Sequence, residues 1–136
     1  MLPLLDQAFP ASTEALVAVR VAVREACQRA GCSAACSEDV VLAINEAAMN
    51  IIQHGYQFAG ASGFTLRLSL DDAVLVAHLL DNGFPATDAD LRPRAFNELR
   101  PGGLGVHFMR ELMDSVAYQL APQGFVNCLQ LSKRIY

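Results

Sequence analysis

The stretch from residue 46 to residue 55, which reads EAAMNIIQHG, constrains the fold of this chain more than any other. Glu46, Asn50 and His54 follow one another at intervals of four, so on an α-helix they lie along one face. Apolar residues recur at helical spacing on the opposite face: Val40, Val41, Ile44, Ala47, Ala48, Ile51 and Ile52. The pattern predicts a helix with one side in a core and a carboxylate, a carboxamide and an imidazole on the other. Taken alone, that polar side would be an ordinary solvated surface.

The composition is that of a folded domain. The chain has 136 residues, of which 53% are hydrophobic and 18% charged, so we expect one domain over residues 1–136. The net charge of −4 argues against a nucleic-acid partner. No apolar run approaches the roughly 20 residues of a membrane span, and the start lacks the pattern of a signal peptide. The four cysteines show no CxxC or zinc spacing, which indicates reduced thiols and favours a cytoplasmic protein without membrane contact.

The first half of the chain reads as a short strand followed by two helices. Residues 2–9 are a candidate edge strand that Pro3 interrupts. The first helix is expected to start at Ser12 as N-cap and to end at Gly31. The second is expected to start at Ser37 as N-cap, to run to His54 and to end at Gly55.

The second half predicts two hairpins separated by a long segment and a helix. Residues 64–70 alternate as a half-buried strand does, and residues 74–80 read as a more central strand. A loop with a short helix near 90–99 follows, then a helix that opens at residues 102–105, and a hairpin of residues 115–120 and 125–131. This order predicts an α+β fold, a two-layer sandwich with helices on one sheet face and the other face partly exposed to water.

Three stretches carry groups suited to a nucleotide. An Asn amide oxygen such as that of Asn50 suits Mg²⁺ bound to phosphates, and a carboxylate such as Glu46 can act as general base. Asp81 at a strand end can accept a hydrogen bond from an exocyclic amine, and Gly83 lets the backbone approach a flat ring. Gly102, Gly103 and Gly105, just before a helix, free backbone N–H groups for phosphate. Each stretch alone is weak, because the second could be an ordinary turn, but together they indicate a nucleotide site.

These stretches also resemble a known family. The sequences NEAAMNIIQHGY, DNGFP and RPGGLGVHFMRELMDSVAY resemble the N-box and the two glycine boxes of the Bergerat-fold, or histidine-kinase-like, ATPases. The likeness is closest to the RsbW and SpoIIAB type of anti-sigma-factor serine kinase, and it extends from about Phe9 to Leu131. The resemblance implies a mixed, mostly antiparallel sheet with helices on one face.

The resemblance implies a role for each matching residue. Glu46 would be the catalytic base, and Asn50 would bind Mg²⁺ together with the phosphates of ATP. Asp81 would recognise adenine, with Gly83 beside the ring. The phosphate-binding stretch would comprise Gly103, Leu104, Gly105 and Val106.

The resemblance also implies a lid and partners. The segment of about residues 84–103 would be the ATP lid, and Arg20 best matches a partner-contacting arginine of the family. The leading interpretation is a kinase that phosphorylates a STAS-type anti-sigma-factor antagonist, binds a sigma factor and forms a homodimer. Two alternatives stay open: a nucleotide-dependent binding module without phosphotransfer, and a partner-switch kinase with a target other than a sigma factor.

Overall fold

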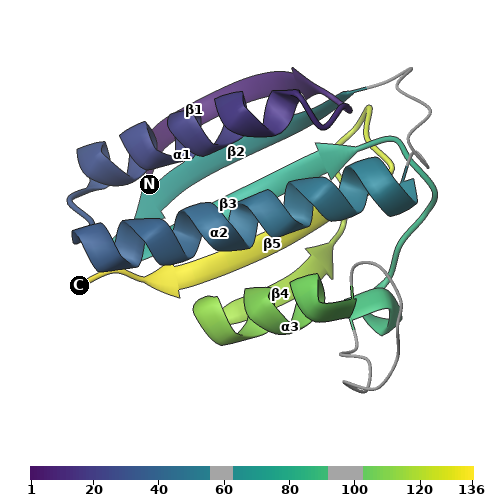
Figure 1. The fold of residues 1–136 in the computed structure, drawn as a ribbon. Coiled ribbons are helices and arrows are strands. Elements are labelled where there is room, and N and C mark those ends of the chain that lie inside the picture. Colours follow the sequence, from purple (N-terminus) through teal and green to yellow (C-terminus); the bar gives the residue numbers. More distant parts are fainter. Residues whose placement is uncertain (56–62, 92–102) are drawn as a thin grey trace.

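A five-stranded sheet forms one layer of the computed structural model, which describes residues 1–55, 63–91 and 103–136 (Figure 1). Its strands are β1 (Leu2–Pro10), β2 (Gly63–Asp71), β3 (Val74–Asp81), β4 (Ser115–Gln119) and β5 (Asn127–Arg134). The spatial order is β1-β2-β3-β5-β4, and every neighbouring pair is antiparallel. The predicted edge strand and both predicted hairpins are confirmed, and β3 is the central strand.

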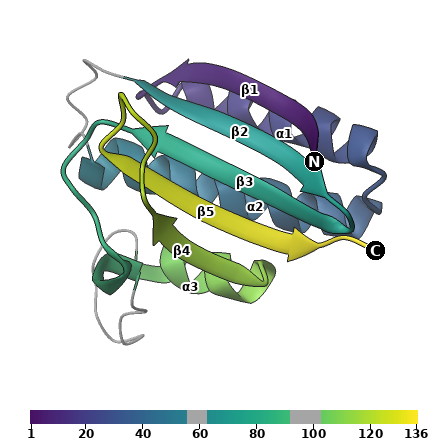
Figure 2. The ribbon, with the colours of Figure 1, turned by 180° about the vertical axis from the view of Figure 1, so that it is seen from behind.

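The described α-helices form a second layer on one face of the sheet. These helices are α1 (Ala15–Ala30), α2 (Ala34–Asn50) and α3 (Gly103–Leu112). Figure 1 shows them in front of the sheet with α2 between α1 and α3, and Figure 2 shows the opposite sheet face uncovered by helices. The predicted two-layer α+β sandwich is confirmed. Within the described ranges, no helix is long and apolar enough to cross a membrane.

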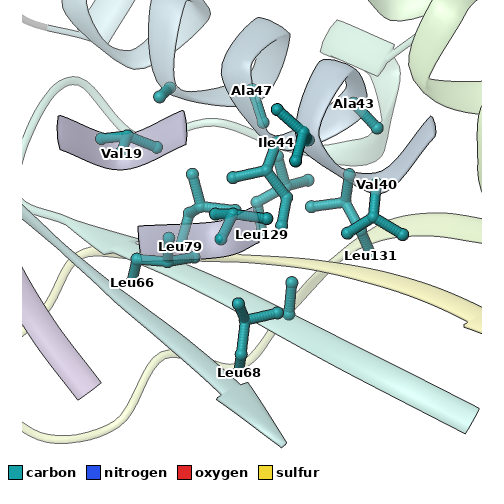
Figure 3. Packing of buried hydrophobic residues seen from close by; sticks show 14 of the residues in the cluster. Val19, Val40, Ala43, Ile44, Ala47, Leu66, Leu68, Leu79, Leu129 and Leu131 are labelled. Carbon is teal, nitrogen blue, oxygen red and sulfur yellow. The ribbon is translucent and has the colours of Figure 1, made fainter. Parts of the chain in front are cut away.

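The core lies between α2 and the three middle strands (Figure 3). Fully buried leucines from β2, β3 and β5 pack beneath the helix, and each contributes roughly 1.5–3 kcal/mol by leaving water. The labelled contributors from helices and strands are Val19, Val40, Ala43, Ile44, Ala47, Leu66, Leu68, Leu79, Leu129 and Leu131. Because this packing fixes the rotation of α2 about its axis, it also fixes the direction in which the polar side of α2 faces.

The opposite face of the sheet is polar, as the alternation in β2 predicts. Asp6, Arg67, His78 and Gln130 are register partners in a row across four strands. Arg67 Nε donates to Asp6 Oδ1 at 3.3 Å, and His78 Nε2 is 2.8 Å from Gln130 Oε1. A residue of the neighbouring strand therefore satisfies the histidine side chain.

Both predicted helix starts are wrong. A turn precedes α1, in which the carbonyl of Ser12 accepts the N–H of Ala15 at 3.1 Å, so α1 begins three residues after the predicted N-cap. The N-cap of α2 is Ser33, whose backbone is extended and whose Oγ accepts the N–H of Cys36 at 3.1 Å. Ser37 lies inside the helix and is 6% exposed. Both Ser33 and Ser37 precede the apolar stripe and could serve as the N-cap of α2. Ser33 is the N-cap because Ser37 is buried, so the turn between the two serines belongs to the helix.

The end of α2 differs from a regular helix. The α-helix ends at Asn50 and continues as a π-helical turn, η1, over Ile51–Gly55. Both isoleucines at its start are buried. The α-helix is thus shorter than predicted, and helical structure continues as a π-helical turn to Gly55, the last described residue before the gap. The side chain of His54 and residues 56–62 lie outside the described part of the structure.

All four cysteines are free thiols, as expected. Desolvation by burial raises the pKa of Cys27, Cys36 and Cys128 above the ordinary thiol value, and it raises the pKa of Cys32 to about 11. All four are therefore protonated at neutral pH, and weak nucleophiles in that form.

The two serines at the start of α2 give a matched test of its capping. Ser33→Ala should lower the free energy of unfolding by about 1 kcal/mol, because it removes an acceptor for a backbone N–H at the helix start. Ser37→Ala should cost less, since among the described residues its buried Oγ has no hydrogen-bond partner. Urea unfolding followed by circular dichroism measures both, and a larger loss at Ser37 would contradict the assignment.

Candidate functional site

Asp81 is a carboxylate at the end of the central strand, and it is only 4% exposed. Its Oδ1 accepts the backbone N–H of Gly83 at 2.9 Å and the Nδ2 group of Asn127 at 3.0 Å. The hydrogen bonds that the described residues give to this side chain all reach Oδ1. A buried carboxylate needs hydrogen-bond donors to offset the loss of water. Since the described donors reach Oδ1, Oδ2 is available to accept a hydrogen bond from a ligand amine.

The Asp81-Asn82-Gly83 stretch is both a turn and part of the site. The bond from Gly83 N–H to the side chain of Asp81 closes an Asx-turn, the local motif that Asp favours. Asn82 Oδ1 accepts the N–H of Val126 at 2.9 Å, which ties this turn to the residue before β5. The stretch can therefore be an ordinary turn and a part of the nucleotide site at once, because the turn holds the carboxylate of Asp81 in place.

Asn127 is a site residue that the sequence analysis missed. It is 6% exposed, and Asp81 is its register partner on the neighbouring strand. Its Nδ2 donates to Asp81 Oδ1 and, at 2.9 Å, to the carbonyl of Phe84, while its Oδ1 accepts the N–H of Ala86 at 2.9 Å. The signal available in the sequence was a carboxamide between Val126 and Cys128, in a stretch where apolar residues predominate.

Glu46 and Asn50 lie on the side of α2 that the core leaves uncovered. Both side chains are half-buried, and Asn50 is the last residue before the π-helical turn. Turns of this kind occur often at functional sites. Figures 1 and 2 place the C-terminal end of α2, the end of β3 and the start of α3 at the same end of the molecule. The fold therefore gathers the elements that carry the three predicted stretches.

The helix α3 begins at Gly103, so the second glycine stretch forms its first turn. The first N–H groups of a helix have no partner within it, and they carry the positive end of the helix dipole. The side chains of Leu104 and Val106 lie outside the described part, as do residues 92–102 of the predicted lid.

Of the predicted short helix at 90–99, only its start is described, within the 3₁₀ turn η2 (Asp88–Leu91). Asp88 Oδ1 accepts the N–H of Tyr118 at 2.7 Å, which fixes this turn to β4.

Arg20 is half-buried between the first two helices. Its Nη1 donates to Asn45 Oδ1 at 2.9 Å, and Asn45 directly precedes Glu46. One helix turn further along α1, Arg24 and Glu38 form an exposed ion pair with a closest N···O distance of 2.9 Å. Arg20 is thus held in place by α2, which distinguishes it from a freely solvated arginine.

Comparison with known proteins agrees with this geometry. Residues 9–133 match the family described as histidine kinase-like ATPase domain. The serine-protein kinase RsbW of Staphylococcus epidermidis is 31% identical over 121 residues, which cover 82% of this chain and 76% of that protein. The chain belongs to the RsbW group of histidine kinase-like ATPases.

Two solved structures share the fold of this RsbW-group chain. The RsbU and RsbW domains of Rv1364c from Mycobacterium tuberculosis align with a TM-score of 0.69 and 22% identity over 99% of this chain. The chain spans about a third, 33%, of that longer protein. The SiaB–SiaC complex from Pseudomonas aeruginosa contains a chain that aligns with a TM-score of 0.62 and 17% identity, over 96% of this chain and 88% of that one.

Replacing the buried carboxylate tests its place in the site. Asp81→Asn should weaken ATP binding roughly tenfold to a hundredfold, because an amide loses a charge-assisted hydrogen bond worth about 1.5–3 kcal/mol. Discrimination against GTP should fall as well. Calorimetric titration measures both affinities, and Asp71→Asn at the exposed hairpin turn is the control. Wild-type affinity in Asp81→Asn would remove this residue from the site.

Proposed function

We propose that this protein is an ATP-dependent protein serine kinase and anti-sigma factor that acts in a partner-switching pathway. The observation that carries the proposal is Asp81, a carboxylate almost fully buried at the end of the central strand, with described donors on one oxygen only. In a chain of the RsbW group, that arrangement supports recognition of the adenine amine. Burial of a carboxylate costs free energy unless its oxygens accept hydrogen bonds, and a ligand amine would supply one to the second oxygen.

Glu46 supplies the base that separates a kinase from a nucleotide-dependent binder. As the hydroxyl oxygen of the acceptor serine attacks the γ-phosphorus of ATP, the bond from that phosphorus to its bridging oxygen breaks and ADP leaves. Glu46 takes the proton of the hydroxyl. The side chain is half-buried on α2, one turn before Asn50, so it is accessible to a docked substrate and fixed by the helix.

Asn50 and the start of α3 fit the phosphates and Mg²⁺. Among the described residues no group of three or more His, Cys, Asp or Glu side chains is arranged to hold a metal ion. A Mg²⁺ ion held by one protein oxygen and by phosphate oxygens needs no such group, and the half-buried amide of Asn50 suits that role. When bound, the ion would neutralise phosphate charge. Gly103 and Gly105 in the first turn of α3 would present backbone N–H groups to the phosphates.

The outer surface of α1 and α2 suits a protein partner. Val17 and Val21, three residues before and one residue after Arg20 on α1, are 59% and 48% exposed, and Leu42 on α2 is 44% exposed. These exposed apolar side chains lie on the same two helices as a guanidinium whose position is set by Asn45. An arginine held on a surface that also exposes apolar side chains is a typical anchor for a carboxylate across an interface.

We assign two alternating occupants to this surface, a STAS-type anti-sigma-factor antagonist and a sigma factor. The antagonist would be the phosphorylated substrate, and the sigma factor would be held when the antagonist is phosphorylated. A sigma factor acts on transcription, so this function places the protein in the cytoplasm, and we propose that it works as a homodimer. The SiaB–SiaC structure, a complex of two proteins, is consistent with partner binding in this fold.

Substitution of the proposed base separates binding from transfer. Glu46→Gln should keep ATP affinity within a fewfold of wild type and lower phosphotransfer to the antagonist by about 10²–10⁴-fold, the usual loss for a missing general base. Asn50→Ala should instead reduce the Mg²⁺-dependent part of ATP binding. Radiolabel transfer and calorimetry measure the two effects. Transfer at the wild-type rate in Glu46→Gln would favour a structural carboxylate, and no transfer in wild type would favour the binding module.

Arg20 and Asn45 form a matched pair for the partner surface. Arg20→Ala should weaken capture of the antagonist or the sigma factor by roughly 1–3 kcal/mol, the hot-spot range, while ATP affinity is unchanged. Asn45→Ala breaks the same 2.9 Å hydrogen bond but keeps the guanidinium, so its effect on capture should be smaller. Surface plasmon resonance with each partner measures both. Equal losses in the two variants would mean that the helix contact, and not a partner contact, explains the effect.

A further inference from the structure

One buried carboxamide joins two parts of the candidate site. Asn127 uses both hydrogens of its Nδ2 group, one for Asp81 Oδ1 at 3.0 Å and one for the carbonyl of Phe84 at 2.9 Å. Its Oδ1 accepts the N–H of Ala86 at 2.9 Å. A single side chain thus holds the carboxylate and the first described residues of the predicted lid.

A polar pair elsewhere in the sheet shows what a merely structural contact looks like. His78 and Gln130 are register partners on β3 and β5, the same strands that carry Asp81 and Asn127. That pair lies on the polar face of the sheet, is half-buried and, within the described residues, joins one side chain to one other side chain. Asn127, at 6% exposed, instead connects a side chain with two backbone groups beyond the end of β3.

We infer that Asn127 is a positioning residue that makes Asp81 selective for a base with an exocyclic amine. The Nδ2 group of Asn127 and the N–H of Gly83 both donate to Oδ1 of Asp81. These two bonds fix the orientation of the carboxylate and leave Oδ2 for the ligand. The inference rests on the proposed function, because it assigns to Asn127 the selectivity of the same nucleotide site.

Loss of this side chain has a specific chemical consequence. Without the Nδ2 group, Asp81 keeps the N–H of Gly83 as its remaining described donor, and the carboxylate is free to rotate or to take up water. The carbonyl of Phe84 and the N–H of Ala86 lose the same partner, so the segment after Gly83 also loses its tie to β5. Contacts to the phosphates come from other elements and should be unaffected, so base recognition should fall selectively.

The test compares two nucleotides that differ only in the amine. Calorimetry gives the ratio of affinities for ATP and for purine riboside triphosphate, which lacks the 6-amino group. In Asn127→Leu that ratio should fall about tenfold or more from its wild-type value. Asn127→Thr, which suits a strand and donates a single hydrogen bond, should lower it as well. Gln130→Leu, which removes the His78 partner from the same strand, should leave the ratio unchanged.

Each outcome has one interpretation. An unchanged ratio in folded Asn127→Leu and Asn127→Thr would overturn the positioning role, as would a fall of equal size in Gln130→Leu. A loss of stability without a change of the ratio would make the residue purely structural. If the wild-type protein bound neither nucleotide, the proposed function itself would fail, and that result is distinct from failure of the role of Asn127.

Discussion

The burial of one carboxylate at the end of β3 sets conditions on the rest of the site. Asp81 is nearly inaccessible to water, and an ionised carboxylate in such a place must be compensated by donors. The compensation comes from a glycine two residues later and from Asn127, a residue 46 positions away in sequence. The antiparallel pairing of β3 with β5 is therefore part of the site, because only that register brings Asn127 opposite Asp81.

The helix layer reaches the same end of the molecule through α2. Small and branched apolar residues bury one side of this helix against β2, β3 and β5, which leaves the side with Glu46 and Asn50 uncovered (Figure 3). The π-helical turn that follows ends the helix beside its polar residues. The burial of Ile44 and Ala47 thus determines where the carboxylate and the carboxamide face, so core packing and site geometry are set by the same segment.

Much of this architecture could be predicted from local patterns. Alternation predicted β2 and helical periodicity predicted α2, since each depends on residues close in sequence. Two features depended on information that a local pattern lacks. Ser33 and Ser37 are equally good caps by type, and tertiary burial of Ser37 decided between them. Asn127 became a site residue only through a strand register, which a single sequence does not specify, although an amide amid apolar neighbours was a visible signal.

The contact between Arg20 and Asn45 links the two halves of the proposed function. Asn45 and Glu46 are consecutive residues of α2, so their side chains diverge by about 100° around the helix axis. Asn45 meets α1 through Arg20, and α2 lies between α1 and α3 (Figure 1). Arg20 is therefore bonded to the same helix turn that carries the proposed base. Because the buried side of that turn is packed rigidly against the sheet, the distance between the partner anchor and the base is fixed by the fold, which is the condition for presenting one serine hydroxyl reproducibly.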